Sequence, residues 1–206
     1  MKAALFDLDG VLIDTEPVYT EIWSDIECHF PTGIDNFAQI IKGTTLPNIL
    51  NQYFRHEDHA AIINMLTEAE DNMEYPLFSG TIPFLKKLKE AGIPAAIVTS
   101  SNDIKMRRLS DMYPGFNEYF DAIITDSHVK RSKPDPEGYL LAASKLGVSP
   151  ADCIVFEDSF NGLKAGIAAG ASVVAIATTN PASTLSQYTT IVATDLSDPT
   201  LDTLFE

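Results

Sequence analysis

The chain opens with Ala3-Ala4-Leu5-Phe6-Asp7-Leu8-Asp9-Gly10-Val11, a short apolar run that leads into two carboxylates and a glycine. Such a run predicts a buried strand that ends at a polar site. In an extended backbone residues i and i+2 point the same way, so Asp7 and Asp9 are expected to face one small volume. Two carboxylates this close repel each other, and a bound cation or a shared proton has to stabilise them. Gly10 lets the chain leave the strand through backbone angles that other residues avoid.

The overall composition excludes several classes of function. The 206 residues are 45% hydrophobic and 21% charged, which is typical of a soluble globular protein. The net charge of −15 is opposite in sign to what a general nucleic-acid or anionic-membrane binder needs. No apolar run approaches the roughly 20 residues of a membrane span, and the N-terminal stretch does not have the pattern of a signal peptide. Cys28 and Cys153 are predicted to be free, buried thiols in a reducing compartment, so we expect a cytoplasmic protein.

Short β-rich runs alternate with helical patterns along most of the chain. The runs that end in polar or small residues are Ala3–Asp7, Ala95–Thr99, Ala122–Thr125, Cys153–Glu157 and Val173–Ala177. The helical patterns, each of which stops just before a glycine, are Thr81–Ala91, Pro136–Leu146 and Ser159–Ala169. This alternation predicts a parallel sheet with helices on both faces. Ligands of such sheets bind beyond the carboxyl ends of the strands.

Residues 15–79 break this rhythm, because they contain no convincing strand. Their apolar residues are spaced as in helices: Ile22, Trp23 and Ile26, then Phe37, Ile40 and Ile41, then Ile62, Ile63 and Leu66. We therefore predict a core formed by residues 1–14 and 80–206, with a helical cap domain, residues 15–79, inserted after the first strand. Trp23 is expected to belong to the interior of this cap rather than to stack on a substrate.

Three further segments place chemically useful residues at predicted strand ends. In Thr99-Ser100-Ser101-Asn102 a hydroxyl followed by free N–H groups can hold phosphate oxygens, although Thr-Ser-Ser is also ordinary turn chemistry. In Ser132-Lys133-Pro134-Asp135-Pro136 two prolines restrict the backbone near a single cation, although a Lys-Pro taken alone is most often a solvated turn. In Val155-Phe156-Glu157-Asp158-Ser159 two acids offer the hard oxygen ligands that Mg²⁺ prefers, although acids are also common at a helix N-terminus.

Taken in order, Phe6-Asp7-Leu8-Asp9-Gly10-Val11-Leu12 and these three segments resemble the four motifs of the haloacid dehalogenase (HAD) superfamily. Within it the chain is most similar to the β-phosphoglucomutase-like branch. The resemblance implies an α/β fold: a Rossmann-like parallel-sheet core with helices on both faces, plus a small inserted all-helical cap. Because most members of the superfamily are phosphohydrolases, it also implies a phosphatase that hydrolyses small phosphomonoesters such as sugar phosphates.

The resemblance assigns the catalytic and metal-binding roles to acids. Asp7 would be the nucleophile that becomes an aspartyl-phosphate, and Asp9 would be the general acid and then the general base. Mg²⁺ would be held by the Asp7 carboxylate, the Asp9 backbone carbonyl and Asp158, with Glu157 supporting these ligands. Elementary chemistry agrees, because a carboxylate nucleophile needs its charge neutralised beside an anionic phosphate.

The phosphate-binding roles implied by the resemblance fall to Thr99, the backbone of Ser100 and Lys133. The expected partner is a small phosphorylated metabolite, with neither nucleic acid nor membrane involved, and we expect a monomer.

Three alternatives stay open at this point. A β-phosphoglucomutase-type phosphomutase is favoured by Lys42-Gly43, but Tyr19 stands where those mutases carry a histidine and Leu46 where they carry an arginine. A true haloacid dehalogenase needs neither a metal nor the second acid, so Asp9 and Asp158 argue against it. A non-catalytic phospho-acceptor domain also combines acids, Mg²⁺, a hydroxyl and a lysine, but it has no inserted cap.

Overall fold

A six-stranded, fully parallel sheet forms the centre of the computed structural model, which describes residues 2–71 and 73–205. The strands follow the order β3-β2-β1-β4-β5-β6. They are β1 (Ala3–Phe6), β2 (Ala95–Val98), β3 (Ala122–Ile124), β4 (Cys153–Glu157), β5 (Ser172–Ile176) and β6 (Val192–Ala193). Leu5 of β1 is in register with Ala96 of β2 and with Val155 of β4. The carboxyl ends of β1, β2 and β4 therefore lie next to one another.

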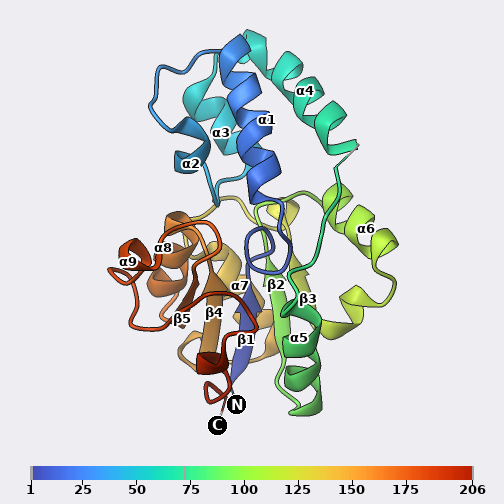
Figure 1. Cartoon of the computed structure of the whole chain (residues 1–206), viewed down its shortest axis with the longest axis vertical. Helices are drawn as coiled ribbons and strands as arrows, with labels where there is room; N and C mark the ends of the chain where they lie inside the picture. The colour runs from blue at the N-terminus through green and yellow to red at the C-terminus, as the bar shows by residue number, and fades with distance from the viewer. Residues whose placement is uncertain (1, 72, 206) are drawn as a thin grey trace.

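Helices cover both faces of this sheet, as the alternation of side chains along a central strand requires. Ala4 and Phe6 pack in one core with α5 (Thr81–Glu90) and α6 (Asp103–Met112). Ala3 and Leu5 pack in a second core with α7 (Glu137–Leu146), α8 (Phe160–Ala168) and α9 (Ala182–Leu185). Figure 1 shows both layers, with the two chain termini at the end of the sheet opposite the cap.

The predicted elements of the core are confirmed, with most ends shifted by one residue. Ser159 begins α8 as predicted, because its hydroxyl accepts a 3.0 Å hydrogen bond from the backbone N–H of Gly162. The sequence analysis did not predict α6 or β6. β6 has only two residues, and α6 buries few apolar side chains, so neither gives a strong periodic signal.

The insertion after β1 is helical, as predicted, and it lies beyond the carboxyl ends of the strands (Figure 1). It contains α1 (Glu16–His29), α2 (Phe37–Ile40), α3 (Leu46–Tyr53) and α4 (His59–Asp71), with a 3-10 turn at His56–Asp58. These helices enclose a separate core formed by Trp23, Ile26, Phe37, Ile41, Ile49, Leu50, Ile62 and Leu66.

Two isoleucines of the helical pattern in the insertion are exposed. Ile40 and Ile63 have 46% and 40% of their surface accessible. Each directly adjoins a buried isoleucine in the sequence, and one residue corresponds to a turn of roughly 100° around a helix. Both positions are helical, as predicted, but these helices bury only one face and the two side chains lie outside it.

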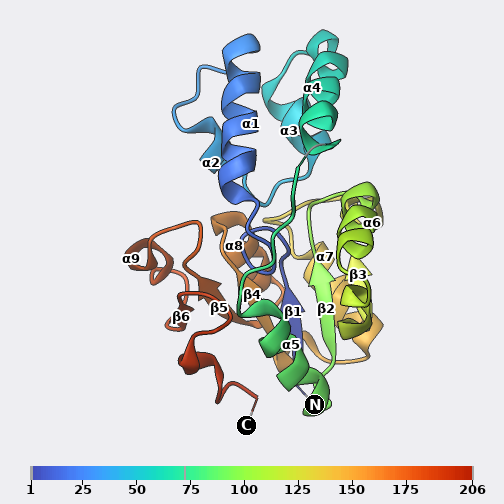
Figure 2. The same ribbon diagram turned by 45° about the vertical axis from the view of Figure 1, so that its right-hand side comes forward.

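The cap and the core are joined by two crossings of the chain that run side by side (Figure 2). The backbone N–H of Asp14 donates to the Pro76 carbonyl at 2.8 Å, and the N–H of Phe78 donates to the Leu12 carbonyl at 3.2 Å. We keep the division into residues 1–14 and 80–206 for the core and 15–79 for the cap as a proposal.

The two cysteines differ in exposure. Cys153 is buried, as predicted, but Cys28 is exposed, so the prediction was wrong for Cys28. It lies two residues after the buried Ile26, roughly 200° around α1, and therefore faces solvent. None of the helices among the described residues is long and apolar enough to cross a membrane.

Candidate active site

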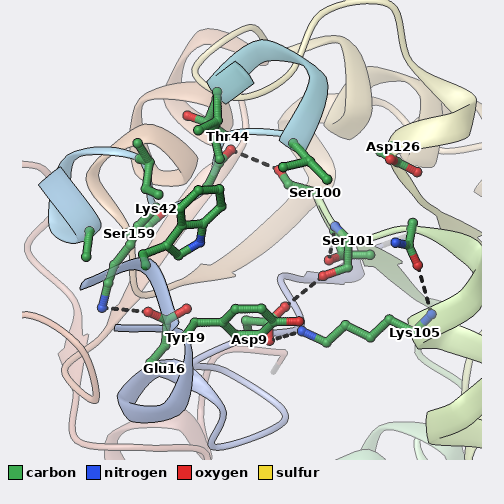
Figure 3. Close-up of a pocket in the computed structure, with 18 of the residues that line it drawn as sticks. Asp9, Glu16, Tyr19, Lys42, Thr44, Ser100, Ser101, Lys105, Asp126 and Ser159 are labelled. Carbon is green, nitrogen blue, oxygen red and sulfur yellow. Dashed lines mark hydrogen bonds and ion pairs between the residues drawn. The ribbon is translucent and has the colours of Figure 1, made fainter. Parts of the chain in front are cut away.

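A cavity of about 230 Å³ lies between the carboxyl ends of the strands and the cap. Its core wall comes from the segments that follow β1, β2 and β4, and includes Asp7, Asp9, Thr99, Ser100, Ser101, Lys105 and Asp158. Its cap wall comes mainly from α1, α3 and the loop between α2 and α3. Figure 3 shows how side chains from both walls converge on this space.

Lys133 forms the only buried cation contact of Asp7 among the described residues. Its Nζ lies 2.7 Å from Oδ1 of Asp7 and 2.6 Å from Oε1 of Glu157, and Lys133 is only 6% exposed. Burial raises the pKa of Asp7 to about 8; Lys133 opposes this shift and Glu157 adds to it. Burial disfavours the charged form of Lys133, but the carboxylates of Asp7 and Glu157 outweigh it and raise the pKa of the lysine above its ordinary value. Lys133 is therefore a positioned, ionised cation.

Glu157 uses both of its carboxylate oxygens to organise the site. Oε1 accepts hydrogen bonds from Lys133 and from the Tyr139 hydroxyl at 2.9 Å. Oε2 accepts from the backbone N–H and the hydroxyl of Ser159, each at 3.0 Å. A Cβ at Gly162 would lie 1.7 Å from Oε1, so the first turn of α8 can approach this carboxylate only without a side chain there. Glu157 thus fixes Lys133 and the start of α8 at once.

Asp158 has the properties of a cation ligand. It is 1% exposed, and its Oδ2 has no hydrogen-bond partner among the described residues. Oxygens of Asp7, Glu157 and Asp158 all lie within 4.8 Å of one another. Burial, followed by the charge of Glu157, raises the pKa of Asp158 well above its ordinary value. A hard divalent cation fits this donor set, because it would offset the cost of burying these charges and occupy the unbonded oxygen.

Gly10 is needed beside this oxygen. Its φ of +75° belongs to the left-handed region, and a Cβ there would meet Oδ2 of Asp158 at 2.2 Å. The glycine that the sequence placed after the two acids therefore both turns the chain and leaves space next to the buried carboxylate.

Asp9 has partners of its own (Figure 3). Its carboxylate accepts hydrogen bonds from Nζ of Lys105 and, at 2.9 Å, from the Ser101 hydroxyl. The Thr15 hydroxyl donates to the same carboxylate. Burial disfavours its charged form, but Lys105 and the hydroxyl donors outweigh burial and lower the pKa of Asp9 below its ordinary value.

Each of the two acids has a lysine partner of its own, which the sequence did not predict. Both line the cavity, but Asp7 pairs with Lys133 while Asp9 pairs with Lys105. The strand ends at Phe6, and the chain turns at Gly10. The i, i+2 rule holds only in extended backbone, so it no longer fixes the relative direction of the two carboxylates.

Lys105 is the residue that the sequence analysis missed. It is 2% exposed, lies in the first turn of α6, and its Nζ is 4.3 Å from the centroid of the Tyr19 ring. Asn102 caps this helix by accepting a 2.9 Å hydrogen bond from the Lys105 N–H, and that cap was the available signal for α6. In the sequence Lys105 is one of three basic residues in Lys105-Met106-Arg107-Arg108, and nothing local marks which one points inward.

Thr99 and Ser100 lie directly after β2 on the same wall. The Thr99 hydroxyl accepts a 3.0 Å hydrogen bond from the Ser101 N–H, and the Ser100 hydroxyl donates to the Gly43 carbonyl of the cap at 2.9 Å. Both residues also line a small pocket together with Lys133. The three residues predicted to bind phosphate are thus close together, although their role itself stays a prediction.

The cap wall combines apolar side chains with paired polar ones. Nζ of Lys42 lies 2.5 Å from Oε2 of Glu16, and the Tyr19 hydroxyl donates to Glu70 at 2.7 Å. Trp23 is 7% exposed and packs edge-on against Phe37 in the cap core, as predicted, but it also lines the cavity.

Comparisons with known proteins agree with this geometry. A family model described as haloacid dehalogenase-like hydrolase matches residues 1–170. Hexitol phosphatase A from Escherichia coli is 34% identical over 180 residues, which cover 85% of this chain and 82% of that protein. A HAD hydrolase of family IA, variant 3, from Entamoeba histolytica superposes with a TM-score of 0.81 at 28% identity and covers 100% of this chain and 98% of its own. β-Phosphoglucomutase from Clostridium difficile shares the fold, with a TM-score of 0.77 at 23% identity over 95% of this chain and 92% of its own.

The four motifs predicted acids and a positioned lysine at the ends of the central strands, and the structure places them there. The helical insertion, which was predicted from the spacing of apolar residues, lies above the sheet. The matching family model spans these motifs from the first strand to the end of α8. The chain therefore belongs to the haloacid dehalogenase-like hydrolase family and is an enzyme of its phosphatase kind.

Proposed function

We propose that this protein is a Mg²⁺-dependent phosphatase that hydrolyses small phosphomonoesters, with sugar and sugar-alcohol phosphates as the substrate class. One observation carries the proposal. Asp7 sits in the cavity with its charge partly balanced by Lys133, and an oxygen of the buried Asp158 lies within 4.8 Å of it. Oδ2 of Asp158 has no hydrogen-bond partner in the part of the chain that the structure describes. This is what a carboxylate nucleophile beside a cation site requires.

Asp7, the backbone carbonyl of Asp9 and Asp158 would hold the Mg²⁺. Glu157 would support this set without ligating the metal, because four donors already occupy both of its oxygens. When bound, the cation would neutralise the buried acids and draw electron density from the phosphoryl group.

The first half-reaction transfers the phosphoryl group to the enzyme. An oxygen of Asp7 forms a bond to phosphorus while the bond between phosphorus and the alcohol oxygen breaks, and protonated Asp9 gives its proton to the departing oxygen. Lys133 has three N–H donors, of which two already bind Asp7 and Glu157, so one is left for a phosphoryl oxygen. The hydroxyl of Thr99 and the backbone N–H of Ser100 would bind the others.

The second half-reaction releases phosphate. The Asp9 carboxylate takes a proton from water, the water oxygen forms a bond to phosphorus, and the bond between Asp7 and phosphorus breaks. In the arrangement described, Asp9 accepts three hydrogen bonds, one of them from a cation, and this favours the ionised form that the second step needs.

The cap wall supports hydrolysis of monophosphates over a phosphomutase reaction. A mutase has to hold a sugar carrying two phosphates, and the second phosphate needs a cation far from Asp7. Among the described residues that line the cavity, Lys42 is the cation on the cap side, and it is already paired with Glu16. Leu46 lines the cavity where an arginine would be required. The name of the Escherichia coli relative, hexitol phosphatase, supports a polyol phosphate as substrate.

Assays with p-nitrophenyl phosphate and a panel of hexitol, hexose and hexose bisphosphates test this proposal. After treatment with EDTA, turnover should stop and should return with Mg²⁺. Monophosphates should yield inorganic phosphate in amounts equal to the alcohol released. Conversion of one sugar phosphate isomer into another without phosphate release would identify a mutase. Stable phosphorylation by acetyl phosphate without any turnover would identify a non-catalytic phospho-acceptor.

A further inference from the structure

We propose that Lys105 is a positioning residue: it holds the Asp9 carboxylate in place and ties that carboxylate to the cap through Tyr19. The inference rests on the proposed function, since it concerns the residue assigned there as acid and base. It assigns a role to a lysine that lies outside the segments from which the phosphatase motifs were recognised.

The contact between Lys105 and Asp9 is built into the interior. Lys105 is 2% exposed, and Asp9 is the acid with which its Nζ forms an ion pair. Two hydroxyls complete the set around the carboxylate, Thr15 from the crossing into the cap and Ser101 from the loop after β2. An ammonium group this deeply buried is costly unless it is paired, so the pair constrains both side chains strongly.

The same lysine contacts the cap. Its Nζ lies 4.3 Å from the centroid of the Tyr19 ring on α1 and 5.5 Å from that of Tyr75, on the segment that returns from the cap. Tyr19 is fixed in turn by a 2.7 Å hydrogen bond to Glu70 on α4. Figure 3 shows the extended Lys105 side chain reaching Asp9 next to the Tyr19 ring. The ammonium group thus contacts both an acid from the core and an aromatic ring from the cap.

This arrangement predicts a specific kinetic effect. Loss of the cation would by itself favour the protonated form of Asp9, so a slower reaction would report lost positioning of the carboxyl group. If Lys105 positions Asp9, its removal should therefore slow the reaction most where a correctly placed proton donor matters most. Sugar and polyol alkoxides are poor leaving groups and need a proton as they depart, whereas acetate or p-nitrophenolate depart with little help. A purely structural role for Lys105 would instead affect all substrates alike.

The experiment compares wild type with Lys105→Met, Asp9→Asn and the double variant, on a hexitol phosphate and on p-nitrophenyl phosphate. We expect Lys105→Met to lower kcat/KM by about tenfold or more for the hexitol phosphate, as a partial loss of acid–base catalysis would. For the aryl phosphate, the factor by which kcat/KM falls should be smaller by about fivefold or more. In the Asp9→Asn background the same change should have an effect of less than about twofold, because its target is already gone. Lys87→Met removes an exposed lysine that pairs with Asp202, and it should leave all rates unchanged.

A second pair of variants keeps the test decisive if Lys105→Met does not fold. Tyr19→Phe keeps the ring beside Lys105 and loses only the hydroxyl. It should therefore keep the wild-type ratio of kcat/KM for the hexitol phosphate to kcat/KM for p-nitrophenyl phosphate. Tyr19→Leu removes the ring and should lower this ratio, as Lys105→Met does. Two results would overturn the role of Lys105 in an enzyme that still hydrolyses phosphate esters. One is an equal loss of kcat/KM on both substrates in Lys105→Met, and the other is a loss in the double variant equal to the product of the two single losses. A wild-type protein without any phosphatase activity would instead overturn the proposed function, and this inference with it.

Discussion

Lys133 donates a 2.7 Å hydrogen bond from Nζ to Oδ1 of Asp7, although the two residues are 126 positions apart in the chain. Lys133 lies in the loop between β3 and α7, whereas β1 and β4 are neighbours in the sheet, so Asp7 and Glu157 lie side by side at the ends of these two strands. Glu157, at the end of β4, holds the same ammonium group from the other side at 2.6 Å. Strand order thus brings Asp7 and Glu157 together, and the loop between β3 and α7 adds the lysine that contacts both acids.

The substitution Asp7→Asn should abolish turnover while the fold survives. Asparagine has nearly the same shape and still offers an oxygen to Lys133, but it cannot form the aspartyl-phosphate, so the loss should be several orders of magnitude. Steady-state kinetics and a thermal unfolding curve check the two halves of this prediction. Residual activity within about tenfold of wild type, or about 1.4 kcal/mol in activation free energy, would show that Asp7 is not the nucleophile.

Asp9→Asn should separate phosphorylation of the enzyme from hydrolysis. With acetyl phosphate the leaving group needs little acid assistance, so Asp7 should still be phosphorylated, but no base remains to activate water. Mass spectrometry should then show an added phosphoryl group that persists longer than in wild type. If the carboxylate of Asp9 were idle, no adduct would accumulate and sugar phosphates would be hydrolysed at nearly the wild-type rate.

Asp158→Asn should weaken metal binding. The substitution removes the charge of the buried acid whose Oδ2 lacks a hydrogen-bond partner, so the Mg²⁺ concentration for half-maximal activity should rise by at least about tenfold. Asp126→Asn is a matched control, because Asp126 also lines the cavity but is not among the three clustered acids. A titration of activity against Mg²⁺ measures both variants. An unchanged midpoint for Asp158→Asn would remove Asp158 from the ligand set.

The stability of the metal-free protein should fall as the pH rises from about 5 to 8. Burial raises the pKa of Asp7 from 3.8 to about 8, so the folded state keeps a proton in this window that the unfolded state has already released. The folded state then binds more protons, and the free energy of unfolding decreases with pH until both states have lost the proton. Mg²⁺ should counteract this fall, and its stabilising effect should be larger at pH 8 than at pH 6, because the cation binds the ionised acids.

Thermal unfolding in EDTA and in Mg²⁺, at several pH values between 5 and 8, checks this prediction. In Asp7→Asn the fall with pH should be smaller, since the group responsible has been removed. A metal-free midpoint that rises across this range would contradict the direction of the Asp7 shift.

Much of the fold could be predicted from the chain because its signals are local. Apolar runs such as Ala95–Val98 and Cys153–Glu157 are buried on both faces and show their strand character without help from neighbours. Serine at position 159 marked the start of α8 through its own hydrogen bond. The two-residue β6 carried no such signal, since its pairing with β5 depends on residues far away. For α6, the few apolar side chains left only the Asn102 cap as a local mark.

The same distinction between local sequence signals and tertiary contacts applies to the candidate site. The sequence by itself determined which acids stand at the strand ends, that Lys133 directly precedes a proline, and that the insertion after the first strand is helical, because each of these follows from residue type and spacing. Only the tertiary structure decided which charges meet. Asp7 and Asp9 are two residues apart, but they pair with Lys133 and Lys105 because the strand ends between them. Whether a lysine is buried depends on what packs around it in three dimensions, so the sequence carried no mark that distinguished Lys105 from its basic neighbours on α6.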